Sequence, residues 1–294
     1  LVGPGRSAYQ QHCASCHVSA SVKRYDAARD TYATAWTDYG TGCERCHGPG
    51  AAHAARYTGT TPVPDGSTAI VVPSRLSPER STGVCAQCHS LRDMTAPGYT
   101  AGDDYDDYFT PILEYGDASR QDPAYWADGR PRRFSNDAIG LWQSRCYLDG
   151  GATCTTCHVD PHEPDIDRNP RLQSASSQIC AGCHAPIATD LSGHTKHAPG
   201  SAANTCVSCH MPRTVVSLRH RMPDHTLSVP APENTVRHGI PNACTECHVD
   251  RPATWAVEVL ASWYPGGRRQ ALVRRADAFS LARQGVPAAL PRLL

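Results

Sequence analysis

The cysteines of this chain follow one repeated pattern. The sequence of 294 residues holds fifteen Cys and fifteen His, and fourteen of the Cys fall in seven copies of Cys-x-x-Cys-His. Two thiols three positions apart can each form a thioether bond with a vinyl group of one haem, and the His that follows is placed to ligate the iron. The pattern therefore predicts seven covalently attached haems of the c type.

The residues of these predicted haem sites are read directly from the seven motifs. The predicted attachment residues are Cys13, Cys16, Cys43, Cys46, Cys85, Cys88, Cys154, Cys157, Cys180, Cys183, Cys206, Cys209, Cys244 and Cys247. The predicted proximal iron ligands are His17, His47, His89, His158, His184, His210 and His248.

Two other interpretations of the cysteines explain less. A disulfide scaffold accounts for many Cys in an exported chain, but not for a His after every second one. Zinc sites with four thiolate ligands need Cys-x-x-Cys units in pairs, and seven units cannot be divided into pairs.

Eight His lie outside the motifs, close to the number needed if most or all of the seven irons carry a second His. The candidate distal ligands are His12, His53, His162, His194, His197, His220, His225 and His238. His162 and His53 follow their nearest proximal His too closely to reach the opposite face of the same iron, so we expect each to serve a neighbouring haem. The pair His194 and His197 supplies one ligand or two, and His12 is the weakest candidate because it abuts Cys13.

The remaining sulfur residues are assigned other roles. Met94, Met211 and Met222 are expected to pack rather than to ligate iron, which predicts mostly bis-His, low-potential haems. Cys146 belongs to no motif, and we expect a buried free thiol there. A thiolate ligand of a haem or a bond to another molecule are the alternatives.

Composition sets the broad class of the protein. The 28 basic and 28 acidic residues cancel, which gives no support for binding to nucleic acid or to an anionic membrane surface. The chain has no apolar run of about 18 residues that would span a bilayer as a helix. With only three Phe and three Met but 24 Pro and 23 Gly, the side chains are poor material for a conventional core. We therefore expect haems to fill the interior.

The motifs and the segments between them predict a mainly α fold with much irregular loop and little β, organised around stacked haems. Residues 1–249 are expected to form the heptahaem domain, with one short strand at 70–72. The acidic and aromatic stretch 103–109 is expected to be a solvated surface excursion, or alternatively a docking surface for a redox partner.

The sequence pattern changes after His248, since neither Cys nor His follows. In residues 250–294 an apolar face formed by Trp255, Val259, Leu260 and Trp263 predicts a helix that ends at Pro265, and a second helix is expected to stop at Gly285. This C-terminal helical hairpin is either a lid over the last haem or the start of a helical-repeat array. The chain begins at Leu1, which fits a removed export signal or a longer protein.

In context, the motifs resemble a family of exported multihaem cytochromes c whose haem region is often followed by tetratricopeptide or other helical repeats. The likeness spans roughly residues 10–265 and rests on these segments: Cys13 to His17 with Tyr25-Asp26-Ala27-Ala28; Gly42 to Gly50 with His53; Cys154 to His158 with Asp160-Pro161-His162; Cys206 to Pro212; Asp224-His225; and Pro241 to Cys244.

This resemblance implies electron transfer outside the cytoplasm. It also implies distal ligation by His53, His162, His225 and one or both of His194 and His197. Members of the family often carry a further upstream haem motif, which this sequence lacks. The chain is more distantly similar to the cytochrome c nitrite reductase and hydroxylamine oxidoreductase group, but it has no Cys-x-x-Cys-Lys motif.

Three functions follow from these residues. The first is an extracytoplasmic electron carrier, in the periplasm, at the cell surface or outside the cell, that serves redox partner proteins and is not itself an enzyme. The second is an oxidoreductase of small nitrogen or sulfur compounds at one open haem. The third is a homopolymer in which neighbouring copies stack into a conductive filament.

Overall fold

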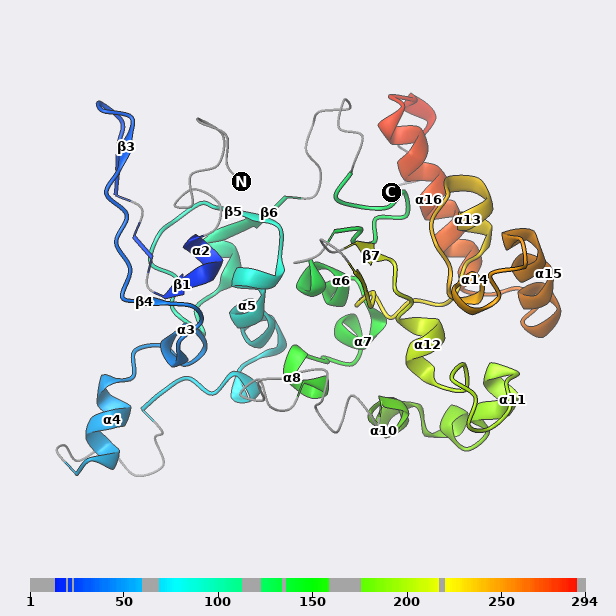
Figure 1. Ribbon diagram of the computed structural model, residues 1–294, viewed down its shortest axis with the longest axis horizontal. Coiled ribbons are helices and arrows are strands. Elements are labelled where there is room, and N and C mark those ends of the chain that lie inside the picture. The colour runs from blue at the N-terminus through cyan, green and yellow to red at the C-terminus, as the bar shows by residue number, and fades with distance from the viewer. Residues whose placement is uncertain are drawn as a thin grey trace. The chain divides into compact units, whose positions relative to one another are not determined.

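Short helices joined by long irregular connections make up most of the chain, and the few strands are two or three residues long (Figure 1). This computed structural model describes residues 14–19, 21–22, 24–59, 69–112, 123–133, 136–158, 176–216 and 220–289. The predicted fold class, mainly α with little β, is confirmed.

The chain forms two units, whose limits differ from the predicted boundary at residue 249. The first unit comprises Leu1–Pro111 with Thr153–Thr155, and the second comprises Ile112–Ala152 with Thr156–Leu294. A haem domain that ends at residue 249 stays a prediction.

The first unit has α2 (Ala14–His17), α3 (Cys43–His47), α4 (Ala51–Tyr57), the 3-10 turn η1 (Pro73–Arg75), α5 (Pro78–His89) and the 3-10 turn η2 (Tyr105–Asp107). Its strands form antiparallel pairs: β1 (Val18–Ser19) with β4 (Asp38–Tyr39), β2 (Tyr25–Asp26) with β3 (Thr31–Tyr32), and β5 (Arg92–Met94) with β6 (Phe109–Pro111). The strand predicted at 70–72 is wrong, since that segment runs without strand pairing into η1.

Helix α5 organises the first unit, because α2, α3, η1 and η2 all contact it. Its start is set by the N-cap Ser77, whose hydroxyl accepts from the backbone N–H of Arg80, and by Pro78 in the first turn. Tyr105 and Phe109, only 4% and 3% exposed, belong to the core of this unit. The prediction of a solvated excursion at 103–109 is therefore wrong for the aromatic residues of that stretch, although most of its acidic residues are exposed.

The second unit carries α6 (Asp137–Trp142), α7 (Arg145–Leu148), α10 (Ser176–Ala188), α11 (Leu191–Thr195), α12 (Cys206–His210), α13 (Glu233–His238), α14 (Ala243–Cys247), α15 (Ala253–Trp263), α16 (Arg269–Arg283) and the 3-10 turn η4 (Pro287–Ala289). Strands β7 (Val215–Val216) and β8 (Arg221–Met222) pair antiparallel. Helix α8 (Cys154–Cys157) carries residues of both units.

The two C-terminal helices lie where the sequence predicts them. Helix α15 ends before the Pro265-Gly266-Gly267 turn, and α16 ends just before Gly285, which adopts a φ of +69°. Both helices contact α13 (Figure 1). The contacts bury small and aliphatic residues, among them Leu260 and Val273.

Candidate functional site

Within the described residues, the Cys-x-x-Cys-His motifs lie on helices or at their ends, and most of these helices have four or five residues. In α3 and α12 all five motif residues are helical, which places the two thiols three positions apart on one face. Side-chain caps fix where two of these helices begin. The Thr205 hydroxyl accepts from the N–H of Ser208 at 3.3 Å, and the Asn242 side chain accepts from the N–H of Cys244 at 3.0 Å.

In the first unit, three motif segments converge on the one that ends α5. A hydrogen bond from the Cys88 thiol lowers the pKa of Cys16 to about 5. Burial, followed by the neighbouring Cys85, raises the pKa of Cys46. A hydrogen bond to Cys154 raises the pKa of Cys85. These thiol contacts bring residues of the first, second and fourth motifs beside the third.

In the second unit, the motif helices follow one another in space as they do in sequence. Helix α12 contacts both α10 and α14. Burial, followed by the neighbouring Cys206, raises the pKa of Cys180 to about 12. Burial, followed by Cys247, likewise raises the pKa of Cys209. The fifth, sixth and seventh motifs therefore form a row.

Three proximal His each face a second His from outside the motifs. The ring centres of His158 and His225 are 6.2 Å apart with an interplanar angle of 25°. The corresponding values are 6.2 Å and 10° for His210 with His194. They are 6.3 Å and 39° for His248 with His197. The structure thus brings together three predicted proximal ligands and three predicted distal ligands.

The separation of these rings fits one iron between each pair. A metal–imidazole bond of about 2.0 Å, plus about 1.1 Å from the nitrogen to the ring centre, puts each centre about 3.1 Å from the metal. Two such rings on opposite faces of one iron have centres about 6.2 Å apart, whereas rings in direct van der Waals stacking lie about 3.5–4.0 Å apart. The three pairs therefore match the spacing that bis-His ligation requires.

The hydrogen bonds of the rings fit the same role. Nδ1 of His210 lies 3.1 Å from the carbonyl of Ser228, and Nδ1 of His197 lies 2.6 Å from the carbonyl of Thr195. In the first unit, Nδ1 of His47 lies 2.7 Å from the carbonyl of Val71. A carbonyl only accepts, so each Nδ1 carries the proton and each Nε2 keeps the lone pair that an iron needs. Burial lowers the pKa of His210, which favours the neutral ring.

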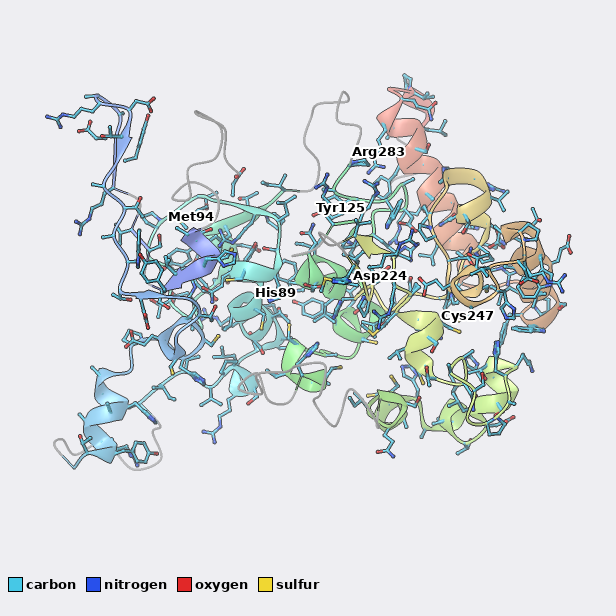
Figure 2. The ribbon with its side chains drawn as sticks, in the orientation of Figure 1. His89, Met94, Tyr125, Asp224, Cys247 and Arg283 are labelled. Carbon is cyan, nitrogen blue, oxygen red and sulfur yellow. The ribbon has the colours of Figure 1, made fainter. Side chains whose placement is uncertain are left out.

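A buried charged cluster holds the segment that carries His225. Asp224 is fully buried in the second unit (Figure 2). Its carboxylate accepts from Arg130 at 3.0 Å and from the N–H of Thr226 at 2.8 Å. Arg130 also pairs with buried Asp128 at 2.7 Å. Burial disfavours the guanidinium charge, but the two carboxylates outweigh that effect and raise the pKa of Arg130.

Two further contacts orient the His225 ring. Nδ1 lies 3.2 Å from the carbonyl of Pro223 and 3.3 Å from the carboxylate of Asp137 on α6. Gly140, also on α6, packs against the His225 backbone, and a Cβ at this position would lie only 3.2 Å from the His225 carbonyl carbon. A small residue at 140 is therefore what lets His225 approach α6.

His238 is placed differently from the three distal candidates above. Its Nε2 lies 2.9 Å from the carboxylate of Asp277 on α16, and Arg237 binds the same carboxylate at 2.6 Å. The nitrogen that would bind iron is thus occupied by a hydrogen bond between α13 and α16. This geometry does not fit the predicted role of His238 as a distal ligand.

The structure places the other predicted site residues in different surroundings. His53 packs on Tyr57 within α4, with ring centres 4.7 Å apart, and His220 is exposed. Among the remaining proximal candidates, His17, His89 and His184 are exposed. Cys13, His12 and His162 lie outside the described residues.

The sulfur residues outside the motifs include Cys146 and Met94. Cys146 is half-buried on α7, and burial, followed by the neighbouring Cys183, raises the pKa of its thiol. Met94, expected to pack, is 39% exposed on β5. All fourteen cysteines in the described ranges, Cys146 among them, are free of disulfide bonds.

Sequence reasoning missed the residues that support the ligands. Asp128, Arg130 and Asp137 lie outside the motifs. Arg130 and Asp137 are identified only by their contacts with the His225 segment, and Asp128 is identified by its ion pair with Arg130. In the sequence, Asp224-His225 entered only as one of the segments that carry the family resemblance, and the burial of Asp224 is seen only in the structure. Among the residues with a described placement, no helix is long and apolar enough to cross a membrane.

The fold is similar to that of a known cytochrome. The solved structure of the outer cell wall cytochrome OcwA matches with a TM-score of 0.62 and 20% sequence identity, over 96% of this chain and 68% of that chain. No protein-family model matches the sequence, and no curated protein matches it. The chain thus has the fold of a cytochrome.

Proposed function

We propose that this chain is a multihaem c-type cytochrome that carries seven covalently attached haems and transfers electrons outside the cytoplasm. The motif cysteines would hold each haem by two thioether bonds, and the motif His would ligate its iron. When bound, haem supplies a one-electron ferric–ferrous couple.

One observation carries the proposal: the three imidazole pairs with ring centres 6.2 to 6.3 Å apart. In each pair, one ring belongs to a motif and the other comes from a distant part of the chain. We assign His225 to the fourth haem, His194 to the sixth and His197 to the seventh. Two ligands held on both faces change little between oxidation states, which suits an electron carrier. They would also leave no open position for a substrate at these three haems.

The arrangement of the motifs within each unit supports a relay. The third motif has neighbours from three other motifs in the first unit, and α10, α12 and α14 line up three motifs in the second. Thiols of successive motifs that lie this close would place successive haems close together. Short gaps are the main requirement for rapid electron transfer.

The extracytoplasmic location rests on two supports. One is the haem attachment chemistry and family resemblance of the sequence. The other is the structural neighbour OcwA, which is an outer cell wall cytochrome. The partners we propose are redox proteins or neighbouring copies of this chain. Electron microscopy of the native sample distinguishes these, because filaments would be visible only in the second case.

The first test is a haem count followed by spectroscopy. Intact-mass measurement should give the chain plus seven haems, and electron paramagnetic resonance of the oxidised protein should show low-spin signals. Cyanide or nitrite, and carbon monoxide after reduction, should leave the optical spectrum unchanged if every iron is capped. A chain without bound haem would overturn the proposal. A high-spin haem that binds these ligands would replace the electron carrier with an oxidoreductase.

A further inference from the structure

One helix of the second unit contacts axial-ligand candidates of two haems. Near the start of α15, the ring of Trp255 lies 4.8 Å from that of His248. At its end, the ring of Trp263 lies edge-on to His197, with centres 6.2 Å apart and an angle of 88°. The next residue, Tyr264, packs on His194 with centres 5.7 Å apart.

Tyr264 also fixes the tautomer of the ring it contacts. Its hydroxyl donates to the backbone carbonyl of His194 and lies 3.3 Å from Nδ1 of the same residue. Since the hydroxyl proton is directed to the carbonyl, the oxygen accepts from the imidazole, and Nδ1 carries a proton. The other nitrogen, Nε2, is then left with its lone pair. The contact therefore sets both the tautomer and the orientation of His194.

The two tryptophans flank the other ligand pair. His197 and His248 are the two rings assigned to the seventh haem, and each has one indole of α15 against it. A rigid helix between Trp255 and Trp263 ties the positions of the two rings to each other. Bulky indoles also restrict the space into which either imidazole could rotate.

Helix α15 is itself held from outside. Arg269, at the start of α16 and only 8% exposed, donates to the carbonyls of Leu260 and Tyr264 at the end of α15. It also pairs with Glu233 of α13 at 2.9 Å. The end of α15, where Trp263 and Tyr264 project, is thus fixed by a buried ion pair.

We propose that Trp255, Trp263 and Tyr264 form a ligand clamp. Its members are positioning residues that hold His194 on the sixth haem and His197 and His248 on the seventh, and Tyr264 tunes the potential of the sixth haem. This inference rests on the proposed haem ligation. It gives the C-terminal helices a function in the electron path, beyond covering the last haem.

The test of Tyr264 is Tyr264→Phe, which removes only the hydroxyl. An imidazole that loses the acceptor of its Nδ1 proton is a weaker donor to iron, so the ferrous state is favoured. Spectroelectrochemical titration should show the midpoint potential of one haem shifted upward. The low-spin resonance of that same haem should move, and the other six should be unchanged. The matched control is Ser262→Ala on the same helix, which removes a hydroxyl bonded to the Val259 carbonyl and touches no axial His.

The test of the indoles is Trp263→Ala. We expect about one equivalent of carbon monoxide to bind per reduced molecule, since His197 is freed to leave the iron, while Ser262→Ala binds none. The clamp is disproved if Tyr264→Phe and Trp263→Ala both carry seven haems and both match the parent protein in potentials, resonances and ligand binding. The electron-carrier proposal would stand in that case. A parent protein that lacks haem would instead remove the proposal on which the clamp rests.

Discussion

Cys146 is the one cysteine that the seven motifs do not use. If fourteen thiols are bound to haem, the denatured holoprotein should incorporate one equivalent of a thiol-specific alkylating reagent, and Cys146→Ser should incorporate none. Intact-mass measurement after labelling gives the count. Two or more labels per molecule would mean that at least one motif cysteine is not bound to haem.

The native protein should label more slowly than the denatured one. Burial raises the pKa of Cys146, so less of the thiol is ionised at neutral pH, and the thiolate is the reactive form. The labelling rate of the folded protein should therefore still be rising at a pH above the ordinary thiol pKa of about 8.5. A rate that levels off below that pH would contradict the shift.

The two His of the sequence pairs Asp224-His225 and Arg237-His238 provide a direct contrast. His225→Ala should open the fourth haem, giving one high-spin iron in seven and binding of about one carbon monoxide per reduced molecule. His238→Ala should leave the spectra unchanged and cost at most about 1 kcal/mol, because it removes one contact of a partly exposed ion pair. High-spin signals in His238→Ala would restore that residue to the ligand set.

At this scale, the sequence predicts which residues take part but not how they pair. The motif predicts every proximal His because attachment and ligation are local in the chain, and the structure places a second His opposite three of them. His225, His194 and His197 are recognisable as spare His, yet their partners depend on tertiary packing. In sequence, His238 is a spare His like these three. Only the position of Asp277 on α16 distinguishes it from them, because the Asp277 carboxylate contacts its Nε2.

Among the secondary structure elements, the position of α6 depends on its contact with the His225 segment. Gly140→Ala would put a methyl group 3.2 Å from the His225 backbone, and overpacking of this kind typically costs about 1–3 kcal/mol. We expect a lower midpoint in guanidinium unfolding and a partly high-spin fourth haem. An unchanged unfolding midpoint together with a fully low-spin fourth haem would contradict this prediction.

The buried Arg130 joins two carboxylates to the same segment. Arg130→Met would leave Asp128 and Asp224 without their cation, and removing one partner of a buried pair costs about 3–5 kcal/mol. Thermal or denaturant unfolding followed at a haem band measures the loss. A variant as stable as the parent would show that this cluster does not hold the His225 segment.

The elements that could be predicted from sequence are those with a strong local signal. The apolar spacing predicted α15, and the Pro-Gly-Gly segment predicted where it ends. The stretch 103–109 misled because its acidic residues hide Tyr105 and Phe109, which turn inward against α5. Alternation of acid and aromatic residues does not show which side faces water when the segment is a 3-10 turn rather than a strand.

For the whole molecule, the cofactor and the fold should depend on each other. Most motif helices have four or five residues, and isolated helices shorter than about 12–15 residues are marginal in water. The chain produced in a host that cannot attach haem should therefore show little far-UV helical signal, whereas the loaded protein should be helical. A haem-free chain with the full helical signal would show that the polypeptide folds unaided.

The row of α10, α12 and α14 also has a consequence for robustness. In a row of haems, electrons pass through each haem in turn, so the loss of a middle haem isolates every haem beyond it. A haem with several neighbours, such as the one at the third motif at the end of α5, can lose one neighbour and still exchange electrons with the others. Under the proposed function, loss of the sixth haem would stop electron transfer between the fifth haem and the seventh. Damage at the first or second motif would leave a route through the third.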